Sequence, residues 1–148
     1  MFDQRDLRSI VGRLLATQEL AVLSTHANGQ SYGNLVAFAS TGDLGHLVFA
    51  TCRATSKFRR LLAEPKVSLL VDNRSSGEAD FQEGIAVTAL GETRIADGPA
   101  RASLVEFYLS RHPSLSTFVE EPDCVLLCVE VERYLVSGFR EAAELRLQ

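Results

Sequence analysis

The sequence predicts a mainly β, α+β fold in which six or seven mostly antiparallel strands close into a barrel. Apolar segments of strand length recur along the chain, and most are joined by short turns, which favours antiparallel pairing. Helical periodicity is confined to one segment before the strands, a short one between them and one late in the chain, which is too little for a doubly wound sheet. The 148 residues show no internal repeat or domain boundary, so we expect a single domain over residues 1–148.

The first predicted elements are a helix and a hairpin. Asp3 is a candidate N-cap, and apolar residues recur behind it at helical spacing, which predicts an amphipathic helix over residues 4–17. A strand is expected over residues 20–25 and a partner strand over residues 32–39, because Asn28-Gly29 between them is typical of a tight hairpin turn.

The middle of the chain predicts two more strands around a short helix. Residues 41–45 form a predicted turn, and a third strand is expected over residues 46–50. A short amphipathic helix beginning near Ser56 is expected to end at Pro65, since proline cannot continue a helix. The fourth strand is expected over residues 67–71.

Polar residues 72–78 then predict a loop. The elements expected after it are the longest strand of the chain over residues 84–96, a helix from Pro99 to His112, a linker over residues 114–123 with one helical turn near Phe118, an apolar strand over residues 124–131 and a short strand over residues 134–139.

Hydropathy and charge narrow the class of protein. No apolar run reaches the length of a membrane span, and charged residues lie within residues 1–6, where a signal peptide has its apolar core. We therefore expect a cytoplasmic protein with no membrane partner. The net charge of −4 disfavours a nucleic-acid partner. A small nucleic-acid-binding barrel is a weaker alternative, since only Phe58 is interleaved with the basic residues between Arg53 and Arg60.

The cysteines and histidines match no metal or disulfide pattern. Three cysteines are an odd number, which argues against a disulfide framework, and Cys124 and Cys128 lie in an apolar strand where buried thiols are expected. None of the histidines is spaced with another ligand residue as a metal site requires, so we expect no metal. His26 and His112 are expected at the surface or at a helix cap.

The segment from Thr51 to Lys57 has the features of an anion site. Thr51, Thr55 and Ser56 supply hydroxyls between an apolar strand and the start of a helix, and Arg53 and Lys57 lie beside them. Free backbone N–H groups at a helix N-terminus bind phosphate, and a nearby ammonium neutralises it. The alternative interpretation is a helix cap followed by a solvated basic face.

The same reasoning predicts where two further basic residues, Arg60 and Arg74, lie relative to the anion. Lys57 directly follows two hydroxyl residues and is expected to face the anion, whereas Arg60, almost a full turn later, is expected to end in solvent. Asn73-Arg74 follows the fourth strand and normally forms only a turn. If the third and fourth strands are neighbours, Arg74 reaches the same anion. The residues thus favour a phosphate-bearing ligand without identifying it.

Four segments of the chain together resemble a known family. The stretch from Phe49-x-Thr51 through Thr55-Ser56-Lys57 to Pro65-Lys66-Val67-Ser68-Leu69-Leu70 resembles a phosphate-binding strand–turn–helix–strand unit. Residues 84–95, with Val87-Thr88-Ala89-Leu90-Gly91-Glu92, resemble the long strand that follows it. The family with this arrangement is the flavin-binding split-barrel family of pyridoxamine 5′-phosphate oxidase. Asp72-Asn73-Arg74 and residues 134–139 are more similar to its small FMN-binding and haem-utilisation relatives.

The resemblance implies a split β-barrel that binds FMN between the two subunits of a homodimer. Carried over residue by residue, Thr55, Ser56 and Lys57 would hold the FMN phosphate, and Thr51 would lie beside the phosphate or the ribityl chain. Asn73 and Arg74 are plausible further contacts. The residues expected along the isoalloxazine ring are Asn34, Leu35, Val36 and Ala37.

The chain departs from the oxidase where the oxidase binds its substrate. Asn34 stands where the oxidase has an arginine, Ala86 replaces a glutamine, and the C-terminal Arg-x-His motif has no counterpart. These changes are compatible with FMN but not with pyridoxamine phosphate as substrate. The resemblance therefore implies an FMN-dependent oxidoreductase acting on an unidentified small molecule, with no residue singled out as catalytic. The alternative is a flavin- or haem-binding module without turnover, such as a sensor or carrier.

Overall fold

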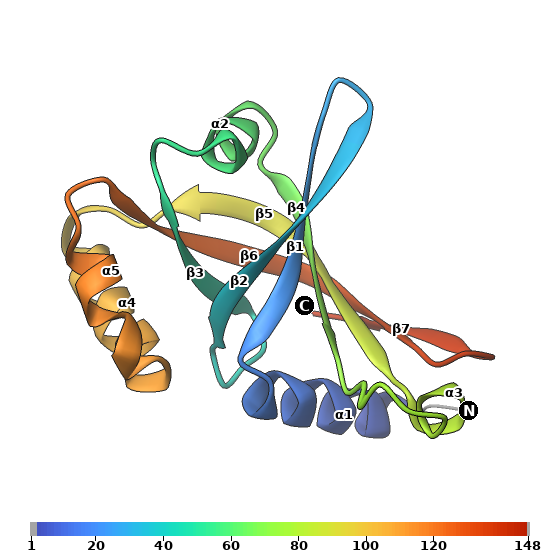
Figure 1. The fold of residues 1–148 in the computed structure, drawn as a ribbon. Helices are drawn as coiled ribbons and strands as arrows, with labels where there is room; N and C mark the ends of the chain where they lie inside the picture. The colour runs from blue at the N-terminus through green and yellow to red at the C-terminus, as the bar shows by residue number, and fades with distance from the viewer. Residues whose placement is uncertain (1–2, 148) are drawn as a thin grey trace.

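The computed structural model describes residues 3–147, so residues 1 and 2 of the charged N-terminal segment lie outside the described residues. Within the described chain, seven strands form one sheet in the order β3-β2-β1-β4-β5-β6-β7, and an additional β3–β6 pairing closes the first six into an antiparallel barrel (Figure 1). The strands are β1 Leu20–Ala27, β2 Gln30–Ser40, β3 His46–Cys52, β4 Lys66–Asp72, β5 Ala86–Ile95, β6 Cys124–Ser137 and β7 Ala142–Arg146. The helices are α1 Gln4–Thr17, α2 Ser56–Ala63, α3 Asp80–Glu83, α4 Gly98–Arg111 and α5 Ser116–Glu120, with a 3-10 turn η1 at Pro113–Leu115. The predicted α+β barrel is confirmed.

The N-terminal helix and hairpin form as predicted. The Asp3 carboxylate accepts a hydrogen bond from the Asp6 N–H at 2.9 Å and so caps α1. At the hairpin, Asn28 and Gly29 have φ angles of 52° and 78°, the left-handed values that a type I′ turn requires. This turn sets the register in which β1 and β2 pair along the whole length of β1.

The C-terminal half of the sheet corrects one prediction. The sequence predicts two strands, over residues 124–131 and 134–139, where the structure has the single strand β6, which is also longer than β5. β6 stays continuous because it pairs with β5 on both sides of a bulge that leaves Glu132 without an opposite residue. Opposite the bulge, a Cβ on Gly91 would lie 2.2 Å from the Glu130 carbonyl oxygen, so only glycine allows this close approach.

Two short elements were not predicted from the sequence. α3 lies in the polar loop after β4, and β7 pairs with the second half of β6 at the edge of the sheet. Four residues are too few to show a helical period, and α3 has no buried side chain. Its Asp80 carboxylate organises the preceding loop by accepting hydrogen bonds from the N–H groups of Ser75 and Ser76.

Apolar side chains pack on both faces of the barrel wall. The interior holds fully buried residues such as Leu23, Phe49 and Leu69, and the buried faces of α1 and α2 join this core. The outer face of β3 and β6 packs under α4 and α5. α4 is fastened there by two bonds to β2, from the Tyr108 hydroxyl to the Ala37 carbonyl oxygen at 2.9 Å and between the His112 ring and the Phe38 carbonyl oxygen at 2.6 Å. His112 is thus a helix cap, as expected, but a buried one.

β2 and β3 separate below α2. They pair only where residues 38–40 meet residues 47–49. Beyond this short ladder β2 continues with β1 while β3 continues with β6, and Figure 1 shows the two strands diverging toward α2. Within residues 3–147, no strand pairs with the second edge of β2 over residues 30–37. This opening lies beside the segment that the sequence predicts to bind an anion.

Candidate functional site

The turn between β3 and α2 is held by Thr55. The Thr55 hydroxyl accepts a hydrogen bond from the Phe58 N–H at 3.2 Å and donates one to the Cys52 carbonyl oxygen at 2.8 Å. Thr55 is therefore the N-cap of α2, in agreement with the simpler interpretation of this residue. The single hydroxyl hydrogen of Thr55 is donated within the turn, so the hydroxyl has no second hydrogen to donate to a phosphate. The contact of Thr55 with a phosphate stays a prediction.

The first turn of α2 presents Ser56 and Lys57 to a possible ligand. The Ser56 side chain is exposed and the Lys57 side chain is partly buried. Their backbone N–H groups come before the first intrahelical hydrogen bond, so the helix itself offers them no acceptor. Burial lowers the pKa of the Lys57 ammonium, and the positive charge of Arg60 lowers it further.

Arg60 is not in solvent, which corrects the prediction made for it. Its Nε donates to the Thr25 hydroxyl at 2.8 Å and its Nη2 donates to the Asn34 side-chain oxygen at 3.3 Å. Its guanidinium also stacks on the Tyr32 ring, 4.1 Å from the ring centroid. Arg60 is three residues after Lys57, so the two side chains share one face of α2. The contacts of Arg60 with Thr25 and Asn34 show that its side chain extends from this face toward β1 and β2.

The cations of this face have no acidic partner. Among the described residues, no carboxylate pairs with Lys57 or Arg60, whose partners are the neutral groups above. Arg53, which the sequence places beside the turn, lies with its guanidinium 5.5 Å from the centroid of the Phe58 ring. The beginning of α2 is thus a partly buried, uncompensated positive site.

Thr51 supplies a second sign of an incomplete site. Its side chain is 2% exposed, and its hydroxyl is a buried side-chain polar atom of the described chain without a hydrogen-bond partner. An unpaired buried hydroxyl costs free energy of about 1–3 kcal/mol, so native structures usually satisfy it with water, an ion or a ligand. The orphan hydroxyl lies at the end of β3, directly before the turn that leads into α2.

The four β2 residues predicted to line a ring differ in what they expose. Asn34 is tied to α2 through Arg60, and Leu35 is 68% exposed. The Val36 side chain is buried in the barrel, and the Ala37 carbonyl oxygen already accepts the Tyr108 hydroxyl. Asn34 and Leu35 therefore offer side chains to a ligand at the open edge of β2, whereas Val36 and Ala37 offer backbone at most.

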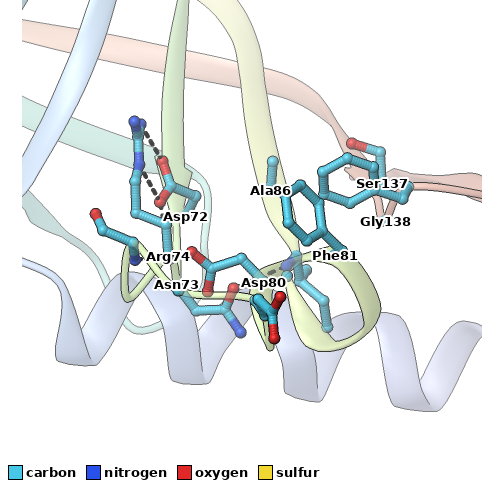
Figure 2. A pocket seen from close by; sticks show the side chains of 14 residues that line it. Asp72, Asn73, Arg74, Asp80, Phe81, Ala86, Ser137 and Gly138 are labelled. Carbon is cyan, nitrogen blue, oxygen red and sulfur yellow. Dashed lines mark hydrogen bonds and ion pairs between the residues drawn. The ribbon is translucent and has the colours of Figure 1, made fainter.

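Asn73 and Arg74 lie at the other end of the barrel. Arg74 is expected to reach the anion only if the third and fourth strands are neighbours. β1 and β2 lie between β3 and β4 in the sheet, so Arg74 does not reach the α2 site of its own chain. Asp72 holds the Arg74 guanidinium with two hydrogen bonds of 2.8 and 2.7 Å, which Figure 2 shows beside Asn73. These residues line a pocket of about 870 Å³, whose far side is formed by Phe81 and the end of β6.

Arg60, Thr25 and Tyr32 are the site residues that the sequence did not identify. Thr25 and Tyr32 are a cross-strand pair in the hairpin, and nothing local in the sequence marks them as neighbours of α2. The spacing of Lys57 and Arg60 does carry a signal, since residues three apart share a helix face. The helix face therefore predicts that Lys57 and Arg60 lie together, whereas the distance of each residue from the helix start separates them.

The arrangement suits binding more than proton transfer. Two cations, a free hydroxyl, two free N–H groups and an orphan hydroxyl all match an oxygen-rich anion. No described side chain of this face is a carboxylate or histidine placed to act as an acid or base. Within residues 3–147, no group of three or more His, Cys, Asp or Glu residues is arranged to hold a metal ion.

Known proteins share this fold. A family model described as pyridoxamine 5′-phosphate oxidase matches residues 11–137. General Stress Protein 26 from Bacillus anthracis superposes with a TM-score of 0.73 at 20% identity, over 95% of this chain and 98% of that one. A FAD-binding protein from Mesorhizobium loti gives 0.66 at 18% identity, over 84% and 88% of the two chains. A haem-binding protein from Mycobacterium smegmatis gives 0.78 at 16% identity, over 90% of this chain but only 55% of that protein.

No curated protein sequence matches the chain significantly. No helix in the described part of the chain is long and apolar enough to cross a membrane. At identities near 20% the solved structures show the shared fold alone, whereas the family model covers most of the chain. The resemblance carried by the strand–turn–helix–strand segment is confirmed, and the chain belongs to the pyridoxamine 5′-phosphate oxidase family.

Proposed function

We propose that this protein binds FMN, with the phosphate at the start of α2. The observation that carries the proposal is the pair of partly buried cations, Lys57 and Arg60, that no carboxylate of the described residues neutralises. Like charges three residues apart on a helix repel each other, so the fold holds this pair at a free-energy cost. A phosphomonoester removes that cost, because it carries about −1.5 to −2 charges at neutral pH and accepts several hydrogen bonds.

The neighbouring groups fit the rest of a phosphate and its chain. The Ser56 hydroxyl and the free N–H groups of Ser56 and Lys57 are donors for phosphate oxygens at the positive end of α2. Thr51 has a buried hydroxyl that needs a partner, and we assign it to the ribityl chain or the phosphate. Thr55 holds the turn in shape as the helix cap, and both its hydroxyl and its N–H donate to the Cys52 carbonyl oxygen.

The isoalloxazine ring is proposed to lie along the open edge of β2. Leu35 exposes an apolar side chain on one face of this edge, and Asn34 places its amide on the other face, toward α2. The backbone of Val36 and Ala37 continues the same edge, on which no strand of residues 3–147 pairs, although the Tyr108 hydroxyl already binds the Ala37 carbonyl oxygen. When bound, FMN supplies redox chemistry, and the residues named here only hold and orient it.

We propose that Asn73 and Arg74 reach the FMN of a second subunit as minor contacts, because Asp72 already neutralises Arg74. The α2 site and the Arg74 pocket lie at opposite ends of one barrel, so one chain cannot bring them to the same ligand. In a two-fold symmetric dimer, a residue i of one subunit that contacts residue j of the partner is matched by j contacting the partner's i, so the α2 end of each subunit can meet the Arg74 end of the other. A homodimer with FMN between its subunits would therefore use both ends.

The proposed reaction is an oxidoreduction on a small molecule, in a cytoplasmic protein with no nucleic-acid or membrane partner. A second candidate is a flavin- or haem-binding module without turnover. This second candidate is favoured because the described residues of the α2 face include no acid or base. It is also favoured by the fold shared with the haem-binding protein from Mycobacterium smegmatis. Reduction of the bound flavin by NAD(P)H, followed by reoxidation in air, distinguishes turnover from simple binding.

The binding proposal is tested by titration of the purified protein with FMN and with riboflavin, followed by flavin fluorescence. We expect FMN to bind with a micromolar or lower Kd. Riboflavin should bind at least tenfold more weakly, because each charge-assisted hydrogen bond to phosphate contributes about 1.5–3 kcal/mol. Equal affinity for the two flavins would show that the α2 face does not bind phosphate. Light scattering of the FMN complex tests the dimer, and a flavin-bound monomer contradicts that part.

A further inference from the structure

Cys52 and Cys124 face each other at the end of the β3–β6 ladder. They are opposite residues in the register of these antiparallel strands. The adjacent Arg53 N–H donates to the Asp123 carbonyl oxygen at 2.8 Å, so that pair is hydrogen-bonded and the cysteine pair is the non-hydrogen-bonded one. The Cα atoms of such a pair lie about 4.5 Å apart, within the range of about 4.4–6.8 Å found in disulfides.

Both thiols also lie on one face of the barrel wall. Cys124 packs in the outer core with Ala50 and Leu126, and opposite residues of antiparallel strands project to the same side. Burial raises the pKa of the Cys124 thiol, and the positive charge of Arg101 opposes this shift.

We propose that Cys52 and Cys124 form an oxidisable dithiol that hydrogen peroxide converts into a cross-strand disulfide. The Cys52 sulfur attacks one peroxide oxygen, the O–O bond breaks, and water leaves with formation of a sulfenic acid. The Cys124 sulfur then displaces the sulfenic oxygen as a second water and forms the S–S bond. In sum, two thiols lose two electrons and two protons, and one peroxide is reduced to two waters.

Cys52 is the residue that peroxide reaches first. Its side chain is partly exposed, whereas Cys124 is only 6% exposed. The Cys52 thiol donates a hydrogen bond to the Asp123 carboxylate at 2.8 Å, which raises its pKa and keeps it mostly protonated. The reaction is therefore slower than that of an activated thiolate, and the resolving thiol is already in place when it occurs.

The disulfide would form at the base of the turn that leads into α2. The Cys52 carbonyl oxygen accepts hydrogen bonds from both the Thr55 N–H and the Thr55 hydroxyl, at 3.2 and 2.8 Å. A bond from Cys52 to Cys124 ties this end of β3 to β6. The proposal does not depend on FMN, since it rests on strand register alone.

The test is peroxide treatment of the folded wild-type protein, alkylation of the remaining thiols, and mass spectrometry of a non-reducing digest. We expect a Cys52–Cys124 cross-linked peptide pair, lighter by two hydrogens than the reduced pair, that dithiothreitol reverses. Cys52→Ser and Cys124→Ser should each abolish it. Cys128→Ser is the matched control and should leave it unchanged, because the register places Cys128 opposite Val48.

Three results would overturn the proposal. One is irreversible oxidation of Cys52 to sulfinic or sulfonic acid while Cys124 remains open to alkylation. Another is a cross-link that joins two chains, detected as a covalent dimer on a non-reducing gel. A third is a disulfide that includes Cys128. Because the cross-link is mapped in the wild-type protein, these outcomes are decisive even if a serine variant does not fold.

Discussion

The two ends of the barrel both carry basic side chains, but within residues 3–147 only the α2 end leaves them without acidic partners. Near α2, Lys57 and Arg60 are partly buried and unpaired with any described carboxylate. Near α3, Arg74 is exposed and Asp72 already binds its guanidinium through two hydrogen bonds. A cation that its own chain has neutralised gains little from a ligand anion. The location of counter-charges, more than the number of basic residues, therefore marks the anion site.

The largest effect is expected from removing both unpaired cations. The double substitution Lys57→Ala with Arg60→Ala should weaken FMN binding by a hundredfold or more, since each charged contact contributes about tenfold to a hundredfold. Riboflavin binding should change much less, because it has no phosphate. Fluorescence titrations of both flavins at one fixed salt concentration measure the difference.

Arg59→Ala is the matched control for that experiment. Arg59 belongs to the same helix and carries the same charge, but its side chain is exposed. We expect its removal to change FMN affinity by less than threefold, as for a solvated surface charge. If Arg59→Ala weakens FMN binding as much as the double substitution does, the anion site is not on the Lys57 face.

A smaller effect is expected from Arg60→Ala alone, and it should have two components. FMN affinity should fall about tenfold, and the flavin-free protein should lose about 1–2 kcal/mol of unfolding free energy. The second loss arises because Arg60 joins α2 to Thr25, Asn34 and Tyr32 of the hairpin. Urea unfolding measures it. A variant of unchanged stability would contradict these contacts, whatever its affinity for FMN.

The same comparison shows what the sequence can and cannot predict. The turn from Thr51 to Lys57 is local, and its hydroxyls, helix start and lysine are adjacent along the chain, so the proposed anion site could be predicted from residue order. The continuity of β6 and the presence of β7 depend on pairing with distant residues, which strand periodicity alone does not show. The environments of Arg60 and Arg74 depend on Asn34 and Asp72 respectively. The environment of Arg60 requires tertiary structure, whereas that of Arg74 is local, because Asp72 is only two residues away in the chain.

The affinity for FMN should also fall at alkaline pH, because Lys57 loses its positive charge there. Burial and Arg60 lower the pKa of Lys57 in the ligand-free protein, while a bound phosphate favours the protonated ammonium. Affinity should therefore fall as pH rises through the lowered pKa, by up to the tenfold that one charge contributes. Lys57→Arg should abolish this dependence, because a guanidinium stays charged there. An identical pH profile for both proteins would assign the dependence to another group.

The smallest effect is expected at the α3 end, from Arg74→Ala. Because Asp72 already neutralises Arg74, FMN affinity should fall by less than threefold, and the melting temperature should fall by no more than a few degrees. The hydrogen bond from Arg74 lowers the pKa of Asp72 in the folded state. The pair therefore stabilises the fold above the ordinary pKa of aspartate, about 3.9, and this contribution disappears as pH falls below it through the lowered pKa. Melting curves of wild type and variant should differ at neutral pH and converge once the pH falls below the lowered pKa of Asp72. A tenfold loss of FMN affinity in a variant that remains dimeric would show instead that Arg74 leaves Asp72 to bind the phosphate, and the contrast between the two ends would then not hold.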